Sequence, residues 1–558
     1  MRESWKRQSL HSSSAAAKVK RLVDDARMYA RFATGMRRFL RSPPQFEAAL
    51  ARVEGSIANR EKNLIRLVEV GVFQHSRSPY RPLFDKAGRS FENVCSLVGT
   101  HGVEGALRVL RDDAVFVSFE EFKGRTPIIR GDLRLSVSDR DFDNPRMRTH
   151  YEGTTGGSTG AGTRVATDLD HLALMIEQSK VYLGLMKDES LPMAVWFPVL
   201  PAASGLSAVL MMTMLGFSTE KWFTPVTSEK MRIPRKYRIA TDYARGMAKL
   251  LGVGIPPPEV VPVSDARKVA AWAGDAIRRE GACYVATYVS LAVRVSIAAQ
   301  EMGIDLTGLT IFATGEPPTP AKVNAIQACG ARFRSAYGFT EGGLLGVSCG
   351  NPLNGTDVHV YRDQWAVLQT RVDVPASTMS VDAFSFTSLF ATTPKVILNV
   401  ELDDYGVLER RQCGCPLMEL FPDHIRDVYS FRKLTGEGMT LVGSTMLRIL
   451  EEVLPDQFGG TALDYQLVEE EDDAGFTRLT IVVSPTVGDV DEAAMIETVL
   501  GEVSRDSAGA DLARAVWKDA GTFRIRRADP TWSTLGKLMS LRPGKRQAAK
   551  VRVEAARR

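Results

Sequence analysis

The sequence predicts an α/β protein, with a large N-terminal α/β domain of layered sheets and helices and a small, mobile α+β domain after it. Two observations predict this organisation. The chain has 558 residues, more than one hydrophobic core accommodates, so two or more domains are expected. From Leu191 to Ile326, short apolar runs alternate with amphipathic segments, as they do where helices are layered on a sheet.

The first elements follow from local periodicity. Residues 44–79 carry apolar side chains at helical spacing and are expected to be helical. The segment Ser78–Phe84 contains two prolines and is expected to break that helix.

One strand–helix–strand unit is predicted in detail. Leu309–Ala313 is apolar and is expected to be a buried strand. Thr319 can cap the next helix with Pro320 at its first position, where a missing N–H costs nothing. Gly330 can close that helix, and Arg332–Ala336 is expected to return as a strand.

A domain boundary is expected near residues 430–438, because Thr435–Gly438 is polar and glycine-rich. Beyond it we expect a small α+β unit over about residues 439–540 and a basic, disordered tail after Arg542. In this unit we expect a helix over residues 447–454 and two strands over 465–468 and 479–483. An acidic turn over 469–473 is expected between the strands. The expected domains are 1–43, a basic extension; 44–432, the large domain; 433–545, the small domain; and 546–558, a basic tail.

The charge distribution limits the classes of partner. Residues 1–43 hold eleven lysines and arginines against three acidic residues, whereas the whole chain carries +5. A nucleic-acid-binding surface over the molecule is therefore not indicated. The basic segment is expected to be a solvated helix or a frayed tail, and contact with an acidic partner or an anionic membrane surface is the alternative.

The sequence also indicates the compartment. It has no apolar run long enough to span a bilayer, and its N-terminus lacks the apolar core of a signal peptide. Six cysteines are few for this length and favour reduced thiols in a cytoplasm over a disulfide framework. The oligomeric state cannot be read from these features.

A glycine-rich loop is the strongest chemical signal. Residues 151–164 contain five glycines among threonine and serine residues. Such a backbone can approach a phosphate closely and offer amide and hydroxyl donors to it. The Gly-Lys-Ser/Thr of a Walker motif is absent, so a P-loop ATPase is not expected. A plain flexible surface loop is the alternative.

Four further segments carry groups that suit a nucleotide. Gly315-Glu316-Pro317 follows a predicted strand, where open α/β sheets bind ligands. Residues 337–343 present an aromatic ring, a hydroxyl and a carboxylate among glycines, and a lone glutamate suits Mg²⁺ with substrate phosphates. Asp404 lies at an expected turn and can accept hydrogen bonds from ribose hydroxyls, and Lys537 lies near the C-terminus. Alone, each fits a turn, a cap or a solvated surface residue equally well.

Together these segments resemble the adenylate-forming superfamily, which includes the acyl-CoA synthetases. Residues 154–164 resemble its phosphate loop, and 337–341 its aromatic-Gly-x-Thr-Glu motif. Asp404 and Lys537 fall where that family keeps its ribose-binding aspartate and its C-terminal catalytic lysine. Residues 78–84, 315–318 and 413–415 resemble the phenylacetate–CoA ligase branch more narrowly. The resemblance covers about residues 60–545.

The resemblance implies a two-step reaction. A carboxylate attacks the α-phosphate of ATP to give acyl-AMP and pyrophosphate, and a thiol, most often that of CoA, then displaces AMP. The implied catalytic residues are Lys537, Thr340 and Glu341, with Glu341 also holding Mg²⁺. The implied nucleotide-binding residues are Thr155, Gly156, Gly157, Ser158, Thr159, Gly160, Gly315, Glu316, Tyr337, Gly338 and Asp404.

Other outcomes of the same resemblance stay open. The acyl group could pass to a carrier protein, a protein cysteine or an amine, or the chain could be a degenerate nucleotide-binding scaffold. The implied cofactors are ATP, Mg²⁺ and CoA, and the implied partners are a carboxylic acid and a thiol, with no nucleic acid. The identity of the acid is not given by the sequence.

Three features depart from the family's pattern or lie outside it. Arg164 stands where the phosphate loop ends in Pro-Lys or similar, and it could replace that charge or face solvent. Thr435–Met439 replaces the Arg-containing hinge of the family, which puts thioester formation in more doubt than adenylation. Cys413 and Cys415 could contribute to a zinc site with His424 or remote ligands, although a Cys-x-Cys spacing is a weak signal.

Apolar segments could line a pocket for an aryl or fatty acyl group, or could equally be core. Cys283 and Cys329 are expected to be core thiols. The apolar segments are 196–198, 206–214 and 284–289.

Overall fold

The computed structural model of the protein describes most of the chain, and the statements below concern that part. The described residues are 23–154, 164–187, 191–200, 202–225, 235–315, 318, 320–373, 380–430, 433–436, 439–442, 446, 449–461, 464–472, 477–503, 514, 517–531 and 541–542.

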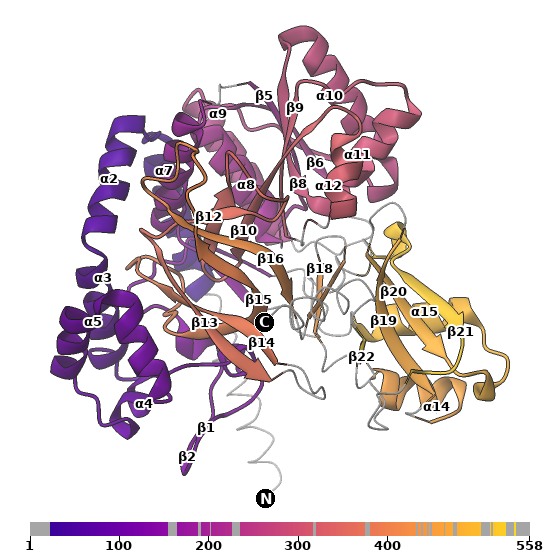
Figure 1. Ribbon diagram of the computed structural model, residues 1–558. Coiled ribbons are helices and arrows are strands. Elements are labelled where there is room, and N and C mark those ends of the chain that lie inside the picture. The colour runs from indigo at the N-terminus through magenta and orange to yellow at the C-terminus, as the bar shows by residue number, and fades with distance from the viewer. Residues whose placement is uncertain are drawn as a thin grey trace, which may run out of the picture.

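A twelve-stranded sheet organises the large domain, in the order β13-β14-β15-β16-β12-β11-β10-β9-β8-β5-β6-β7. From β10 to β7 neighbouring strands are parallel, and from β10 to β13 they are antiparallel. The predicted α/β class is therefore confirmed, and Figure 1 shows helices packed around this sheet.

The parallel half alternates strands with helices, as the sequence predicted. Every residue of β8 is buried, as expected of a parallel strand covered on both faces. Its strands are β5 (Pro192–Trp196), β6 (Ser218–Thr224), β7 (Pro258–Val260), β8 (Cys283–Tyr288), β9 (Leu309–Thr314) and β10 (Arg332–Phe339). Its helices are α8 (Ala203–Met214), α9 (Arg235–Leu250), α10 (Arg267–Glu280), α11 (Val289–Glu301) and α12 (Pro320–Gln327).

The detailed unit predicted around β9 is confirmed. The strand covers the expected residues, α12 begins at Pro320, and β10 extends three residues beyond the expected Ala336. Gly330 has φ of +88°, and a Cβ there would lie 2.4 Å from Thr307 Oγ1. Thr319, the expected cap, lies outside the described residues.

The antiparallel half continues the sheet with longer strands. Its strands are β11 (Gly343–Ser348), β12 (Val358–Val360), β13 (Trp365–Asp373), β14 (Ser380–Ser388), β15 (Val400–Arg410) and β16 (Asp423–Ser430). The sequence analysis did not place these strands individually.

Helices and two hairpins make up the N-terminal part. The expected helix over 44–79 is two α-helices and a π-helical turn. The elements are α2 (Phe46–Ala58), α3 (Arg60–Val68), η1 (Glu69–Phe73), α4 (Arg81–Lys86), α5 (Phe91–Asp112), α6 (Phe119–Phe122), η2 (Asp139–Phe142) and α7 (Leu169–Leu185), with hairpins β1 (Ile128–Arg130)–β2 (Leu133–Leu135) and β3 (Tyr151–Thr154)–β4 (Arg164–Thr167).

For the described part of the N-terminal segment, the expected helix is confirmed, whereas a frayed tail is wrong and the helix is only partly solvated. Residues 23–40 are helical, and Phe32 and Met36 are buried. Phe32 packs against Tyr151 and Tyr243. This helix therefore carries basic side chains together with an apolar face, and the large domain covers that face.

The C-terminal part contains a separate four-stranded sheet in the order β21-β20-β19-β22, and Figure 1 draws it beside the large domain. Both predicted strands are present, and β19 extends into the expected acidic turn. The described part of the predicted helix is a π-helical turn that continues into a short α-helix. Its elements are η4 (Ile449–Val453), α14 (Leu454–Phe458), β19 (Tyr465–Glu471), β20 (Thr477–Val483), η5 (Pro485–Val487), α15 (Glu492–Val503), β21 (Phe523–Arg527) and β22 (Leu541–Arg542).

The segment expected to be a flexible linker contains regular structure. β17 (Lys433–Gly436) pairs with β18 (Met439–Val442) in an antiparallel hairpin. Thr435 and Gly436 are therefore strand residues, and the prediction was wrong because backbone pairing with a facing strand outweighs local glycine content.

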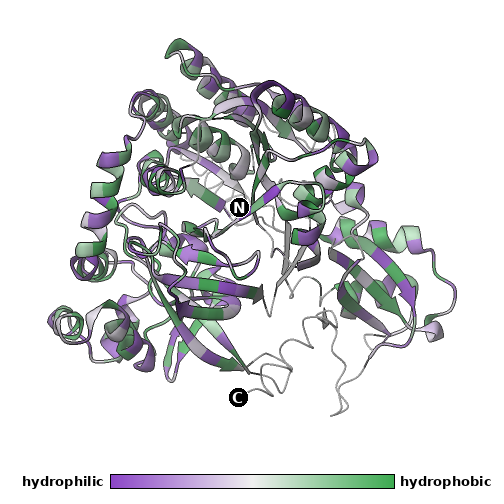
Figure 2. Cartoon of the chain, turned by 45° about the horizontal axis from the view of Figure 1, so that its top comes forward, coloured by the Kyte–Doolittle hydropathy of each residue, from purple (hydrophilic) through white to green (hydrophobic). Residues whose placement is uncertain are grey.

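Among the residues that the structure describes, buried apolar side chains form one extended cluster. In Figure 2 the helices carry both hydrophobic and hydrophilic residues, as expected of elements with one face against a core. Among the described residues, no helix is long and apolar enough to cross a membrane.

Candidate functional site

The candidate site lies at the carboxyl ends of β9 and β10. The two strands are parallel, and Ala313 pairs with Ser335, so Gly315 lies level with Tyr337, two residues further along each strand. Gly315 has φ of +84°, and a Cβ there would lie 2.7 Å from the Tyr288 ring. The backbone at this edge is therefore closely packed, which glycine permits.

The structure brings together Tyr337 and Asp404, which the sequence separates by 67 residues. The Tyr337 hydroxyl donates a 2.8 Å hydrogen bond to Asp404 Oδ2. Burial and the negative charge of Asp404 both raise the pKa of Tyr337 well above its ordinary value. The phenol therefore stays protonated and positions the carboxylate on β15.

Glu341 is buried beside Lys123 and forms an ion pair with it, the two side chains being 7% and 9% exposed. Burial raises the pKa of Glu341, but the charge and hydrogen bond of Lys123, with a contribution from the charge of Lys395, lower it by more. The pKa of Glu341 therefore lies below its ordinary value. The carboxylate is therefore ionised. A metal ion at Glu341 would have to share it with the Lys123 ammonium.

A chain of charged side chains connects this region with the glycine-rich loop. Lys395, which lowers the pKa of Glu341, lies 3.1 Å from Asp143. Asp143 also pairs with Arg164, the first residue of β4, and Arg164 binds Glu152 of β3 at 2.9 Å. The hairpin that carries the loop is therefore linked electrostatically to Glu341.

Arg164 does not face solvent. Its side chain is 14% exposed and contacts two carboxylates, those of Asp143 and Glu152. Its charge is already balanced by these partners. Of the two roles the sequence left open, exposure to solvent is therefore wrong.

The turn after Glu341 is fixed by packing. The Gly342 carbonyl accepts a 2.9 Å hydrogen bond from Gln364 Nε2 and lies 3.3 Å from His171 Nε2. Burial lowers the pKa of His171 to about 4, so the imidazole is neutral. A Cβ at Gly342 would lie 2.4 Å from the Trp365 ring, which leaves room only for glycine.

Two other predicted residues belong to the same turn. Gly338 pairs with Leu344 next to a bulge in the β10–β11 register, and a Cβ there would lie 2.5 Å from the Gly343 carbonyl oxygen. Thr340 is exposed at the tip of the turn, where its hydroxyl is accessible to a ligand.

The remaining predicted residues cannot be placed, and their roles stay predictions. They lie outside the described residues: Thr155, Gly156, Gly157, Ser158, Thr159, Gly160, Glu316 and Lys537.

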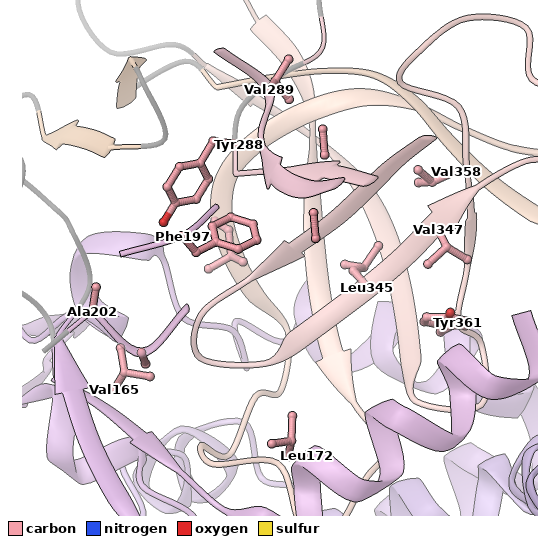
Figure 3. Packing of buried hydrophobic residues seen from close by; sticks show 14 of the residues in the cluster. Val165, Leu172, Phe197, Ala202, Tyr288, Val289, Leu345, Val347, Val358 and Tyr361 are labelled. Carbon is pink, nitrogen blue, oxygen red and sulfur yellow. The ribbon is translucent and has the colours of Figure 1, made fainter. Parts of the chain in front are cut away.

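The apolar segments suggested as an acid pocket include core. Trp196 is fully buried and donates to the Val261 carbonyl, while Tyr284 stacks on Phe312. Phe197 and Tyr288 pack edge to face with ring centroids 4.7 Å apart, as Figure 3 shows. Tyr288 lies against Gly315, so this pair connects those segments with the candidate site.

A cavity of 370 Å³ lies beside α12, and none of the predicted site residues lines it. It is lined by Pro318, Pro320, Val323, Asn324, Gln327, Phe333, Ser348, Pro352, Asn354, Gly355, Thr356, Asp427 and Val428.

Sequence reasoning missed Lys123, Lys395 and His171. Lys123 lies 218 residues before its partner Glu341, so no local motif connects them. His171 stands on the buried face of α7, together with the polar residues Gln178 and Ser179. No signal in a single sequence distinguishes these residues from other lysines and histidines.

Comparison with known proteins gives the fold. No family model matches the sequence, and no curated protein matches it. Among solved structures, the chain is similar to 2-hydroxyisobutyryl-CoA ligase in complex with 2-HIB-AMP and CoA, at 14% identity over 91% of this chain and 93% of that chain, with a TM-score of 0.51. The two proteins share a fold. An amide bond synthetase from Marinactinospora thermotolerans, at 13% identity over 81% of this chain and 78% of that one, has a TM-score of 0.40, too low to carry an argument.

Proposed function

We propose that the protein activates a carboxylic acid with ATP to form an acyl-AMP, and then transfers the acyl group to the thiol of CoA. The observation that carries the proposal is the convergence of three distant segments. Tyr337 hydrogen bonds to Asp404, and charged side chains link Glu341 to Arg164 at the end of the glycine-rich loop.

The chemistry explains why such a convergence is useful. Attack of a carboxylate on a phosphate brings two anions together, so the site must supply oriented donors and positive charge where the new charge develops. In the proposal, Thr155–Gly160 bind the outer phosphates, Thr340 contacts the α-phosphate, and Lys537 bridges the carboxylate and the phosphoryl oxygen.

The described residues fit a nucleotide at this edge of the sheet. Asp404 offers a carboxylate oxygen to ribose hydroxyls, and Tyr337 with the closely packed backbone of Gly315 would flank the base. In the proposal, Glu316, which lies outside the described residues, joins them. Mg²⁺, when bound with the phosphates, would neutralise part of their charge. Glu341 is the proposed ligand, with its carboxylate shared between the ion and Lys123.

The choice of CoA as acceptor rests on the shared fold. The similar structure is a CoA ligase with an acyl-AMP and CoA bound. We propose the same acceptor, CoA, for this chain. The β17–β18 hairpin stands where a hinge between the two domains is proposed, with the small domain turning between the half-reactions.

The test is acid-dependent exchange of radiolabelled pyrophosphate into ATP, screened over aromatic, short-, medium- and long-chain acids. We expect exchange with at least one class of acid, and AMP release that then rises when CoA is added. If AMP release rises instead with an amine or a carrier-protein thiol, that compound and not CoA is the acceptor. Absence of exchange with every acid, in protein that binds ATP, would contradict the proposal.

A further inference from the structure

Five cysteine and histidine side chains meet on the antiparallel half of the sheet, near the end of β15. Cys349 directly follows β11, His359 lies in β12 and His424 in β16. Cys413 and Cys415 follow β15. Because β12 pairs with β16 so that His359 faces His424 in register, the fold itself gathers these residues from four chain segments.

The donor atoms lie at distances that suit one small ion. Cys415 Sγ is 3.9 Å from Cys349 Sγ, 3.5 Å from Cys413 Sγ and 3.1 Å from His359 Nε2. Cys413 Sγ is 3.6 Å from His359 Nε2. Zinc binds thiolate sulfur at about 2.3 Å and imidazole nitrogen at about 2.0–2.1 Å, so the edges of its coordination tetrahedron are roughly 3.3–3.8 Å.

Both histidines are oriented as metal ligands usually are. His359 Nδ1 contacts the Phe421 carbonyl oxygen, and His424 Nδ1 lies 2.7 Å from Asp357 Oδ1. A proton held on Nδ1 by these acceptors leaves the Nε2 lone pair facing the sulfurs, the arrangement that second-shell partners impose on zinc ligands.

His424 supplies an independent observation. Its side chain is fully buried, and its Nε2 atom has no hydrogen-bond partner among the described residues. The donor atoms of His424, Cys349, His359 and Cys413 all lie within 4.8 Å of one another. A buried nitrogen left without a partner costs free energy unless something binds it or lies against it.

We propose that this cluster binds one Zn²⁺ in a structural site through Cys349, His359, Cys413 and Cys415, with His424, whose Nε2 is unpartnered among the described residues, as the alternative to Cys415 for the fourth position. Thiolate and imidazole ligands select zinc over magnesium or calcium. Each coordinating thiol loses its proton to solvent on binding. The Arg411 guanidinium lies 3.5 Å from Cys349 Sγ and pairs with Asp357, the carboxylate that also contacts His424 Nδ1.

Such a site would be structural rather than catalytic, because four protein ligands leave no open position for a substrate. It would tie the segment after β15 to the ends of β11 and β12. The inference does not depend on the proposed function, since zinc content and acid activation are measured separately.

The test is the zinc content of the full-length chain, purified without chelators, measured by mass spectrometry of the metal. We expect about one zinc per chain, the content of a single closed site. Cys349→Ser, Cys413→Ser and Cys415→Ser should lose most of it. Cys283→Ser and Cys329→Ser are matched controls, because these buried thiols lie outside the cluster, and both should keep the parent's zinc.

Two comparisons keep the proposal falsifiable if a variant folds poorly. Replacing zinc by Co²⁺ in the parent chain should give the absorption of tetrahedral cobalt with thiolate charge-transfer bands. A parent chain that contains no zinc and shows no such absorption would overturn the site. Loss of zinc in His424→Ala, with full zinc in Cys415→Ser, would overturn the assignment of Cys415 in favour of His424.

Discussion

The Lys123–Glu341 pair gives the sharpest prediction for stability. In Glu341→Gln, the Lys123 ammonium stays buried and loses its ion pair with the Glu341 carboxylate. The two side chains are only 9% and 7% exposed, so solvent screens the pair little. Removing one partner of a buried ion pair costs about 3–5 kcal/mol. Because Lys123 also lies 5.4 Å from the centre of the Phe119 ring, we expect a loss of about 3 kcal/mol, the lower end of that range.

The assay is urea unfolding followed by tryptophan fluorescence. The matched control is Glu301→Gln, which removes a partner from the Arg267–Glu301 pair, whose side chains are 65% and 52% exposed. Exposed pairs contribute about 0–1 kcal/mol, so this variant should unfold near the parent's midpoint. Lys123→Met combined with Glu341→Gln should recover part of the loss, because the buried ammonium of Lys123 is removed together with its partner. Equal midpoints for Glu341→Gln and Glu301→Gln would refute the reasoning.

The same pair predicts a pH dependence. The folded-state pKa of Glu341 lies below its ordinary value, whereas in the unfolded chain the glutamate titrates near its ordinary pKa of about 4.3. The stabilisation is therefore complete above the unfolded pKa and is lost as the pH falls through the folded pKa. The difference in unfolding free energy between the parent and Glu341→Gln should shrink on acidification. A difference that stays constant or grows would contradict the assigned ionisation.

The remaining predictions concern the site and its turn. Lys537→Ala should lower acyl-AMP formation by about 10²-fold or more, with ATP binding kept, as expected when a donor to the developing charge is removed; activity within about threefold of the parent, well inside that loss, would remove Lys537 from the site. Asp404→Asn should weaken ATP binding in equilibrium titrations, whereas unchanged affinity would exclude the ribose role. Gly342→Ala should destabilise the protein by about 1–3 kcal/mol through contact with the Trp365 ring, while Gly55→Ala, which meets nothing within 4 Å, should stabilise it slightly; thermal unfolding compares the two, and equal shifts would contradict the packing.

The fold could be predicted where local signals and burial agree. The β9–α12–β10 unit followed from an apolar run, a proline at a helix start and a glycine after it. The β17–β18 hairpin could not be predicted in this way, because Lys433–Gly436 has no strand pattern by itself and is held by pairing with β18. The burial of one face of the N-terminal helix was also not predicted, because its many basic residues outweighed the apolar residues Phe32 and Met36 in the sequence.

The candidate site could be predicted only in its local motifs. The proximity of Tyr337 to Asp404 is consistent with the family resemblance, but the partner Lys123 depends on how α6 packs against the turn after β10. The zinc cluster was visible in the sequence only as Cys413 and Cys415, with His424 as a candidate. Cys349 and His359 join it through strand pairing, which residue spacing does not reveal.

The central claim is that a carboxylate oxygen attacks the α-phosphorus of ATP. An acid labelled with heavy oxygen in its carboxylate, incubated with the protein, ATP and CoA, tests this most directly by mass spectrometry of the products. We predict that AMP carries one labelled oxygen, because the bridging oxygen stays with the phosphorus when the thiol attacks the carbonyl carbon. Label in inorganic phosphate, with ADP as the other product, would contradict the account.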